Sequence, residues 1–119
     1  MKSKILVVDD DVDLCDLIHQ ILLDEGYLVE HAYDGNTALQ KLTESNFNLV
    51  IIDNKLKGMY GVEVLEKAKI IKPSLKSMMI SAYGTPATKS RAKKLGVLDF
   101  IDKPFEISKL VESVKKFLN

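Results

Sequence analysis

Two apolar segments of this sequence end abruptly in aspartate. Residues 5–8 are followed by Asp9 and Asp10, and residues 49–52 are followed by Asp53. Short apolar runs rich in β-branched residues are typical of strands buried on both faces of a parallel sheet. A carboxylate at the carboxyl end of such a strand stands where open α/β sheets bind their ligands. Asp53 alone could equally be a cap for the following turn, so the interpretation depends on the other strand ends.

Two further segments, residues 77–80 and 97–101, are followed by Ser81 and by Asp102-Lys103. The carboxyl ends of parallel strands lie at one edge of a sheet, so these polar residues are expected to meet there. The candidate site consists of Asp9, Asp10, Asp53, Ser81 and Lys103.

The formal charge of this group predicts a cation and a phosphoryl group as ligands. Three carboxylates and one ammonium leave a charge of −2, which one divalent ion would neutralise. Oxygen ligands favour Mg²⁺, with Mn²⁺ as a substitute. Lys103 could then bind a phosphoryl oxygen and Ser81 could donate a hydrogen bond to another. Asp53 is the expected phosphoryl acceptor, and a carboxylate nucleophile needs no separate general base.

The segments between the strands have helical spacing of apolar residues. Strands are predicted over residues 5–8, 27–32, 47–52, 77–80 and 97–101, the second being a more polar edge strand. Helices are predicted to begin near Val12, Gly35, Val62, Pro86 and Ile107. Residues 54–61 are expected to form a glycine-containing loop. Five alternating pairs of strand and helix predict an α/β domain, with helices on both faces of a parallel sheet.

Composition narrows the class of protein. The 119 residues suit one domain, spanning residues 1–119, and 17 basic residues balance 17 acidic ones. This balance gives no support for direct nucleic-acid or membrane-surface binding. Cys15 is the only cysteine, so an internal disulfide is excluded, and its apolar neighbours predict a buried thiol. A membrane span requires about 20 consecutive apolar residues, and no segment approaches this length. No signal-peptide pattern is present. A cytoplasmic protein is expected.

Four short motifs carry a resemblance to a known family. Residues 7–10, 51–53, 80–82 and 102–105 resemble the motifs of two-component response-regulator receiver domains, in the same order and at the expected strand ends. The resemblance covers the whole chain. It implies a flavodoxin-like (βα)5 three-layer sandwich with a five-stranded parallel sheet of order 2-1-3-4-5.

The resemblance also implies a function and partners. Asp53 would accept a phosphoryl group from a histidine kinase or histidine phosphotransfer protein. The chain would be a signalling phosphoacceptor in a phosphorelay, not an enzyme acting on a separate substrate. Phosphorylation would change its affinity for a downstream protein or output domain, which would bind the surface of the fourth helix, fifth strand and fifth helix.

Several residue roles follow from the same resemblance. Asp9 and Asp10 would hold Mg²⁺ together with Asp53 and the backbone carbonyl of Lys55. Ser81 and Phe100 would form the switch pair, although Phe100 lacks the hydroxyl group of a tyrosine and could instead be a half-exposed strand aromatic. The peptide bond between Lys103 and Pro104 would be cis.

The sequence departs from the family pattern after the acceptor. The loop reads Lys57-Gly58-Met59-Tyr60-Gly61 where Pro-Gly-Met-Asp-Gly is usual. The loss of the proline frees one backbone φ angle, so the loop is expected to be more mobile. Tyr60 replaces an acid that would cap the third helix. Asn54 stands where an apolar residue is common, which affects packing.

Lys55 and Tyr83 flank the path by which water would attack a phosphoryl group on Asp53. Neither side chain readily positions a water molecule, so a persistent phosphoprotein is predicted. The alternative is that both are solvated loop side chains without a kinetic role.

Two features outside this group are open to simple interpretations. The basic residues of the fourth helix could be a solvated face or part of a partner surface; they are Lys89, Arg91, Lys93 and Lys94. His19 and His31 have no ligand at motif spacing and are expected to be surface or satisfied histidines.

Three other functions are alternatives to a receiver domain. A phosphatase of the haloacid-dehalogenase kind needs an acid two residues after its nucleophile, and that residue is Lys55. A dinucleotide carrier needs a Gly-x-Gly-x-x-Gly motif after the first strand, where this chain has acids. A receiver-like scaffold that acts without phosphorylation is the remaining alternative.

Overall fold

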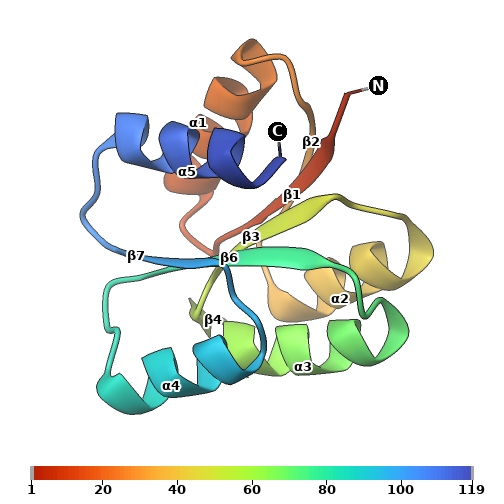
Figure 1. Ribbon diagram of the computed structural model, residues 1–119, viewed down its shortest axis with the longest axis vertical. Coiled ribbons are helices and arrows are strands. Elements are labelled where there is room, and N and C mark those ends of the chain that lie inside the picture. Colours follow the sequence, from red (N-terminus) through yellow and green to blue (C-terminus); the bar gives the residue numbers. More distant parts are fainter. Residues whose placement is uncertain (1, 119) are drawn as a thin grey trace.

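A five-stranded parallel sheet forms the middle layer of the molecule (Figure 1). The computed structural model describes residues 2–118. The strand order is β2-β1-β3-β6-β7. The strands are β1 (Lys4–Val8), β2 (Leu28–Ala32), β3 (Leu49–Asp53), β6 (Lys76–Ser81) and β7 (Asp99–Asp102). Because β6 and β7 are the fourth and fifth strands of this sheet along the chain, the predicted order 2-1-3-4-5 is confirmed.

Helices cover both faces of the sheet, as Figure 1 shows. The first face carries α1 (Val12–Asp24) and α5 (Ile107–Leu118), and the second carries α2 (Gly35–Glu44), α3 (Gly61–Ile71) and α4 (Pro86–Lys94). The predicted flavodoxin-like α/β class is therefore correct. Within residues 2–118, none of these helices has the length and apolar character that a membrane span requires.

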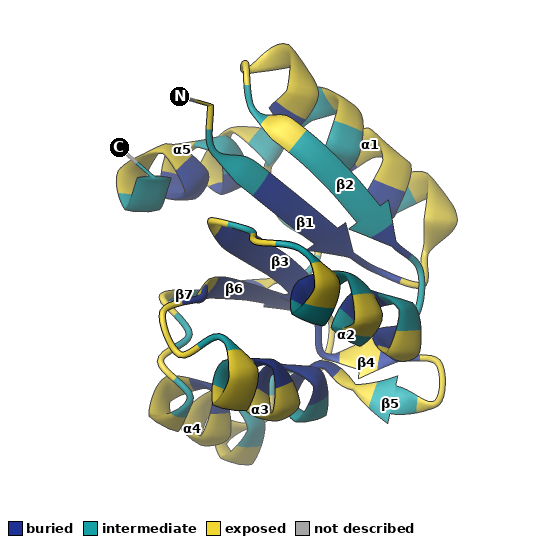
Figure 2. Cartoon of the chain, turned by 90° about the vertical axis from the view of Figure 1, so that its right-hand side faces the viewer, coloured by how far each residue is buried: buried dark blue, intermediate teal, exposed yellow. Residues whose placement is uncertain are grey.

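Alternate residues of the central strands divide the core into two clusters. In β1, Ile5 and Val7 pack with α1 and α5, whereas Leu6 and Val8 pack with α2 and α3. This follows from the two-residue period of a strand whose two faces are both covered. Every residue of β3 is buried, while β2 is mostly half-buried, as predicted for an edge strand (Figure 2).

Short polar side chains begin three of the helices. Asp11, Asp34 and Thr85 each accept a hydrogen bond from the backbone N–H three residues later. Gly26 and Gly96, which follow α1 and α4, have φ values of +98° and +79°. A residue in this left-handed conformation ends a helix at the least cost when it is glycine.

Residues 54–61 differ from the prediction of a loop. They contain a small antiparallel hairpin of β4 (Lys55–Leu56) and β5 (Met59–Tyr60), with Gly58 at φ +77° in its turn. Leu56 is buried in the core of the α2–α3 face, and this contact anchors the hairpin. Strands of two residues are too short to produce a periodic pattern, which is why the sequence does not reveal them.

Asn54 caps the start of α3 from a position before the hairpin. Its Oδ1 accepts the N–H of Val62 at 3.2 Å, and its carbonyl accepts the N–H of Gly61 at 2.6 Å. The Glu63 carboxylate also accepts the N–H of Tyr60 at 3.3 Å. Asn54 is therefore more than a packing change, because it helps to satisfy the helix start at which Tyr60 replaces an acid.

Candidate functional site

The carboxyl ends of four strands bring the predicted site residues to one edge of the sheet. Asp9 follows β1, Asp53 ends β3, Ser81 ends β6 and Lys103 follows β7. The backbone N–H of Lys103 donates to the carbonyl of Ser81 at 2.8 Å, which fixes these two strand ends side by side. Residues up to 94 positions apart therefore share one small volume.

The ammonium of Lys103 bridges two buried carboxylates. Its Nζ lies 2.9 Å from Oδ2 of Asp9 and 3.1 Å from Oδ2 of Asp53. Asp9 is fully buried and Asp53 is 5% exposed. Both ion pairs are largely shielded from solvent. Removal of one partner would leave a buried charge without compensation, which destabilises the folded state.

The remaining oxygens of these carboxylates are held by backbone groups. Oδ1 of Asp9 accepts the N–H of Asp11 at 3.0 Å, and Oδ1 of Asp53 accepts the N–H of Lys55 at 3.3 Å. These bonds orient both carboxylates and place the backbone of Lys55 beside the Asp53 side chain.

The electrostatics of the cluster show an excess of negative charge. Burial raises the pKa of Asp53, and the charge of Asp9 raises it further, to about 6, although Lys103 opposes both effects. Desolvation lowers the pKa of Lys103, but its hydrogen bonds and charge interactions with Asp9 and Asp53 outweigh this, so that pKa is raised. One ammonium therefore does not neutralise the carboxylates that surround it.

The acidic cluster fits a divalent cation. Asp9, Asp10 and Asp53 each offer a carboxylate oxygen, and these oxygens lie within 4.8 Å of one another. Asp10 is exposed at the edge of the cluster, whereas the other two are buried. An oxygen-only set with excess negative charge suits a hard ion such as Mg²⁺ and would not suit a soft metal.

An open pocket of about 380 Å³ leads to Asp53. Asp10, Asp53, Lys55 and Tyr83 are among the residues that line it. Lys55 comes from β4 and Tyr83 from the segment after β6, and the Lys55 ammonium lies 5.2 Å from the centroid of the Tyr83 ring. The two residues predicted to flank the acceptor therefore contact each other at its entrance.

Ser81 is buried beside this entrance. Its Oγ accepts the N–H of Tyr83 at 3.1 Å. A serine hydroxyl also has one proton to donate, so this group could still donate a hydrogen bond to a ligand in the pocket.

Phe100, the other predicted switch residue, lies half-buried on β7. Its ring contacts the start of α4, where the Lys89 ammonium lies 5.3 Å from the ring centroid. Lys89 also pairs with Asp102 at 3.3 Å. A Cβ atom on Gly84 would come within 2.8 Å of the ring. The absence of a side chain at Gly84 thus makes room for Phe100.

Two predictions outside the acidic cluster also agree with the structure. The peptide bond between Lys103 and Pro104 is cis, as expected. Cys15 is fully buried on α1, and burial raises the pKa of its thiol to about 12.

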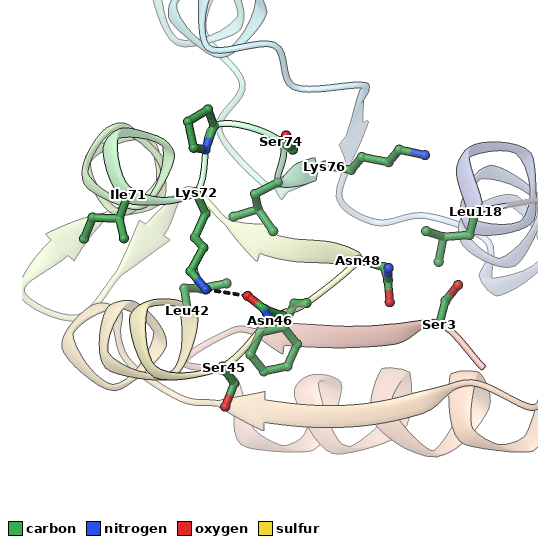
Figure 3. A pocket seen from close by; sticks show the side chains of 13 residues that line it. Ser3, Leu42, Ser45, Asn46, Asn48, Ile71, Lys72, Ser74, Lys76 and Leu118 are labelled. Atoms are coloured by element: carbon green, nitrogen blue, oxygen red, sulfur yellow. Dashed lines mark hydrogen bonds between the residues drawn. The ribbon is translucent and has the colours of Figure 1, made fainter. Parts of the chain in front are cut away.

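A larger cavity, of about 470 Å³, lies at the opposite edge of the sheet (Figure 3). Lys72 donates a hydrogen bond to Asn46 there, and Ser74 and Lys76 are also among its lining residues. No carboxylate lines this cavity within residues 2–118. The chemistry predicted from the sequence therefore belongs to the smaller pocket at Asp53.

One contact was missed by the sequence reasoning. His19 on α1 and His31 on β2 are 12 residues apart, yet their Nδ1 atoms lie 2.9 Å from each other. The expectation of surface or satisfied histidines is confirmed, because each is half-buried and is the hydrogen-bond partner of the other. The pairing itself was not predicted. The contact depends on how α1 packs against β2, and motif spacing carries no information about that packing.

Comparison with known proteins gives consistent results. Residues 5–115 match the family model for the response regulator receiver domain. The chain is 36% identical to sporulation initiation phosphotransferase F of Bacillus subtilis (strain 168), covering 99% of this chain and 95% of that protein. It is also 36% identical to the transcriptional regulatory protein ZraR of Salmonella typhimurium, covering 98% of this chain but only 26% of that protein.

A solved structure supports the same assignment. The response regulator receiver domain protein (CheY-like) from Methanospirillum hungatei JF-1 superimposes with a TM-score of 0.94 at 36% identity. The alignment covers 98% of this chain and 93% of that chain.

Proposed function

Because the chain belongs to the response regulator receiver domain family, we propose that Asp53 accepts a phosphoryl group from a phosphohistidine. The donor is a histidine kinase or a histidine phosphotransfer protein. The observation that carries the proposal is the position of the Lys103 ammonium. It lies within 3.1 Å of both Asp9 and Asp53 at the carboxyl edge of the sheet. A cation in that position can bind a phosphoryl oxygen as the group arrives at Asp53.

The transfer is a displacement at phosphorus. An oxygen of the Asp53 carboxylate forms the new P–O bond, the P–N bond to the donor imidazole breaks, and its electron pair returns to the ring nitrogen. The Ser81 hydroxyl donates to one phosphoryl oxygen and Lys103 binds another. Asp9, Asp10, Asp53 and the backbone carbonyl of Lys55 would hold Mg²⁺, which would offset the charge on the phosphoryl oxygens.

The proposed donor docks beside the pocket. An apolar groove of about 440 Å³ lies next to Lys103 and is lined by Leu14, Leu17, Phe105 and Ile107 among others. Ala82 lines both this groove and the Asp53 pocket. Because the groove and the pocket adjoin, a protein bound in the groove could place a phosphohistidine at Asp53. The exposed side chain of Leu17 would be buried in this complex.

The proposed output is a change in partner affinity. A phosphoryl group on Asp53 draws in the Ser81 hydroxyl, and Phe100 shifts toward the space this leaves. The shift would alter the contacts of Phe100 and Asp102 with Lys89, and so the surface of α4, β7 and α5 that a downstream protein or output domain would bind. The protein would act as a signalling phosphoacceptor that performs only its own phosphorylation and slow dephosphorylation.

Phosphoramidate is a suitable test donor because it carries the same P–N bond as phosphohistidine. The wild type should gain one phosphoryl group by intact mass with Mg²⁺ present and none with EDTA. Asp10→Asn should react more slowly, because it removes one cation ligand. Asp11→Asn is the matched control, because Asp11 caps α1 and lies outside the acidic cluster.

The proposal fails if the folded wild type gains no phosphoryl group with Mg²⁺ present. A receiver-like scaffold that acts without phosphorylation would then be the better account.

A further inference from the structure

Two imidazole rings from different elements meet between α1 and β2. Nδ1 of His19 lies 2.9 Å from Nδ1 of His31, and the ring centroids are 5.0 Å apart. Two lone pairs or two N–H groups would repel each other at this distance, so one ring must donate its Nδ1 proton to the other. A single proton is therefore shared in a hydrogen bond between two imidazole nitrogens, and imidazole nitrogen is a common metal ligand. This pair plays no part in the phosphoryl transfer proposed above.

The surroundings of His19 favour its neutral form. Burial lowers the pKa of His19 and the charge of His31 lowers it further, while Asp16 opposes these effects. The Asp16 carboxylate accepts a hydrogen bond from the Tyr33 hydroxyl at 2.6 Å, and the Tyr33 ring packs against His31 with centroids 4.8 Å apart and planes inclined by 37°. Both histidines are half-buried, so solvent still reaches the pair. Neutral imidazole is the form that binds metal ions.

We propose that His19 and His31 form a binding site for a transition-metal ion with affinity for imidazole, Ni²⁺ or Cu²⁺. Bonds of about 2.0–2.1 Å to two nitrogens at adjacent square-planar or octahedral positions separate those nitrogens by about 2.9 Å. This is the separation observed. The ion would lie to one side of the line between the nitrogens, so both rings rotate toward it.

Binding needs no co-reactant. The ring that donates the hydrogen bond moves its proton from Nδ1 to Nε2, so both Nδ1 lone pairs become available without net proton release. Water completes the coordination. Asp16 is a further candidate ligand because it lies three residues before His19 on the same helix, and side chains at that spacing share a face.

The site differs in chemistry from the acidic cluster. Asp9, Asp10 and Asp53 offer only oxygen atoms, which suit Mg²⁺, whereas the histidine pair offers nitrogen atoms, which Mg²⁺ binds poorly. The two sites therefore discriminate between the two kinds of ion. An ion at the histidine pair would join α1 to β2 and stabilise the folded state by mass action.

The test is a calorimetric titration of untagged protein with Ni²⁺ in excess Mg²⁺, which keeps the acidic cluster occupied. The chain has two histidines, so no other imidazole competes. The wild type should bind one Ni²⁺, and His19→Gln and His31→Gln should each weaken binding by at least about tenfold, since each removes a ligand. Cys15→Ser is the matched control and should bind Ni²⁺ as the wild type does.

A second measurement uses the wild type alone, in case a variant folds poorly. Octahedral Ni²⁺, with water at its remaining positions, is paramagnetic, so the NMR signals of His19 and His31 should broaden first as it is added. Broadening centred on Asp9 and Asp10, unchanged Ni²⁺ affinity in both histidine variants, or no saturable binding by the wild type would each overturn the proposal.

Discussion

The Lys55 ammonium lies 5.2 Å from the centroid of the Tyr83 ring, at the entrance of the pocket that leads to Asp53. Tyr83 is 69% exposed, so the contact is a surface cation–π interaction worth about 0.5–1 kcal/mol. Its position matters more than its strength, because we predict that both side chains flank the path of a water molecule that hydrolyses an aspartyl phosphate.

Loss of this contact should shorten the life of the phosphorylated protein. We expect Lys55→Ala and Tyr83→Ala each to speed dephosphorylation by about two- to fivefold, the factor that corresponds to losing the cation–π energy. The decay of the phosphorylated mass with time measures the rate. Lys57→Ala is the control, because Lys57 lines the same pocket without contacting the ring. A rapid decay in the wild type that neither substitution changes would show that Lys55 and Tyr83 have no kinetic role.

Asp53 should destabilise the metal-free protein at neutral pH. The pKa of Asp53 is about 6 in the folded state, whereas the pKa of an aspartate in an unfolded chain is about 3.9. Between these two pH values the folded state therefore binds more protons than the unfolded state. Stability therefore falls as pH rises from about 4 to about 6, and the full penalty remains above that window. In EDTA, Asp53→Asn should have the larger free energy of unfolding at pH 7.5, by on the order of 1–3 kcal/mol.

Urea unfolding of both proteins at pH 4 and pH 7.5 measures this difference. The gap should close near pH 4, where both side chains are neutral, and it should shrink when Mg²⁺ is added at pH 7.5. A variant less stable than the wild type at pH 7.5 in EDTA would mean that the ion pair with Lys103 outweighs the burial of Asp53.

Gly61 should be required for the geometry of the acceptor. A Cβ atom there would lie 2.5 Å from the carbonyl oxygen of Asp53, so the backbone must move to admit any side chain. We expect Gly61→Ala to lower the free energy of unfolding by about 1–3 kcal/mol, as overpacking does, and to slow phosphorylation. Gly58→Asn is the control. Gly58 has open space around it, so any loss of stability there comes only from its positive φ, which asparagine adopts more readily than other residues that have a side chain. Equal stability of Gly61→Ala and the wild type would contradict this account.

The sequence predicted the sheet and its acidic edge because local patterns determine both. The run from Leu49 to Ile52 is typical of a strand buried on both faces, which predicts that the acid after it lies at the edge where Asp9 and Lys103 also lie. Strand ends shifted by one or two residues: the fifth strand was predicted over residues 97–101 and spans Asp99–Asp102.

The features that were missed depend on tertiary contacts. The β4–β5 hairpin has strands of two residues and is held by the burial of Leu56, so no periodicity marks it. Asn54 caps a helix that begins seven residues later, outside the usual capping position. The contact between His19 and His31 arises only when α1 lies on β2.

The central claim is that Asp53 is the phosphoacceptor, and the most direct measurement is the intact mass of wild type and Asp53→Asn after incubation with Mg²⁺ and acetyl phosphate. The account predicts that the wild type gains the mass of one phosphoryl group, that EDTA prevents this, and that Asp53→Asn gains nothing although it remains folded. A folded wild type that gains no mass, or an Asp53→Asn protein that gains as much as the wild type, would contradict it.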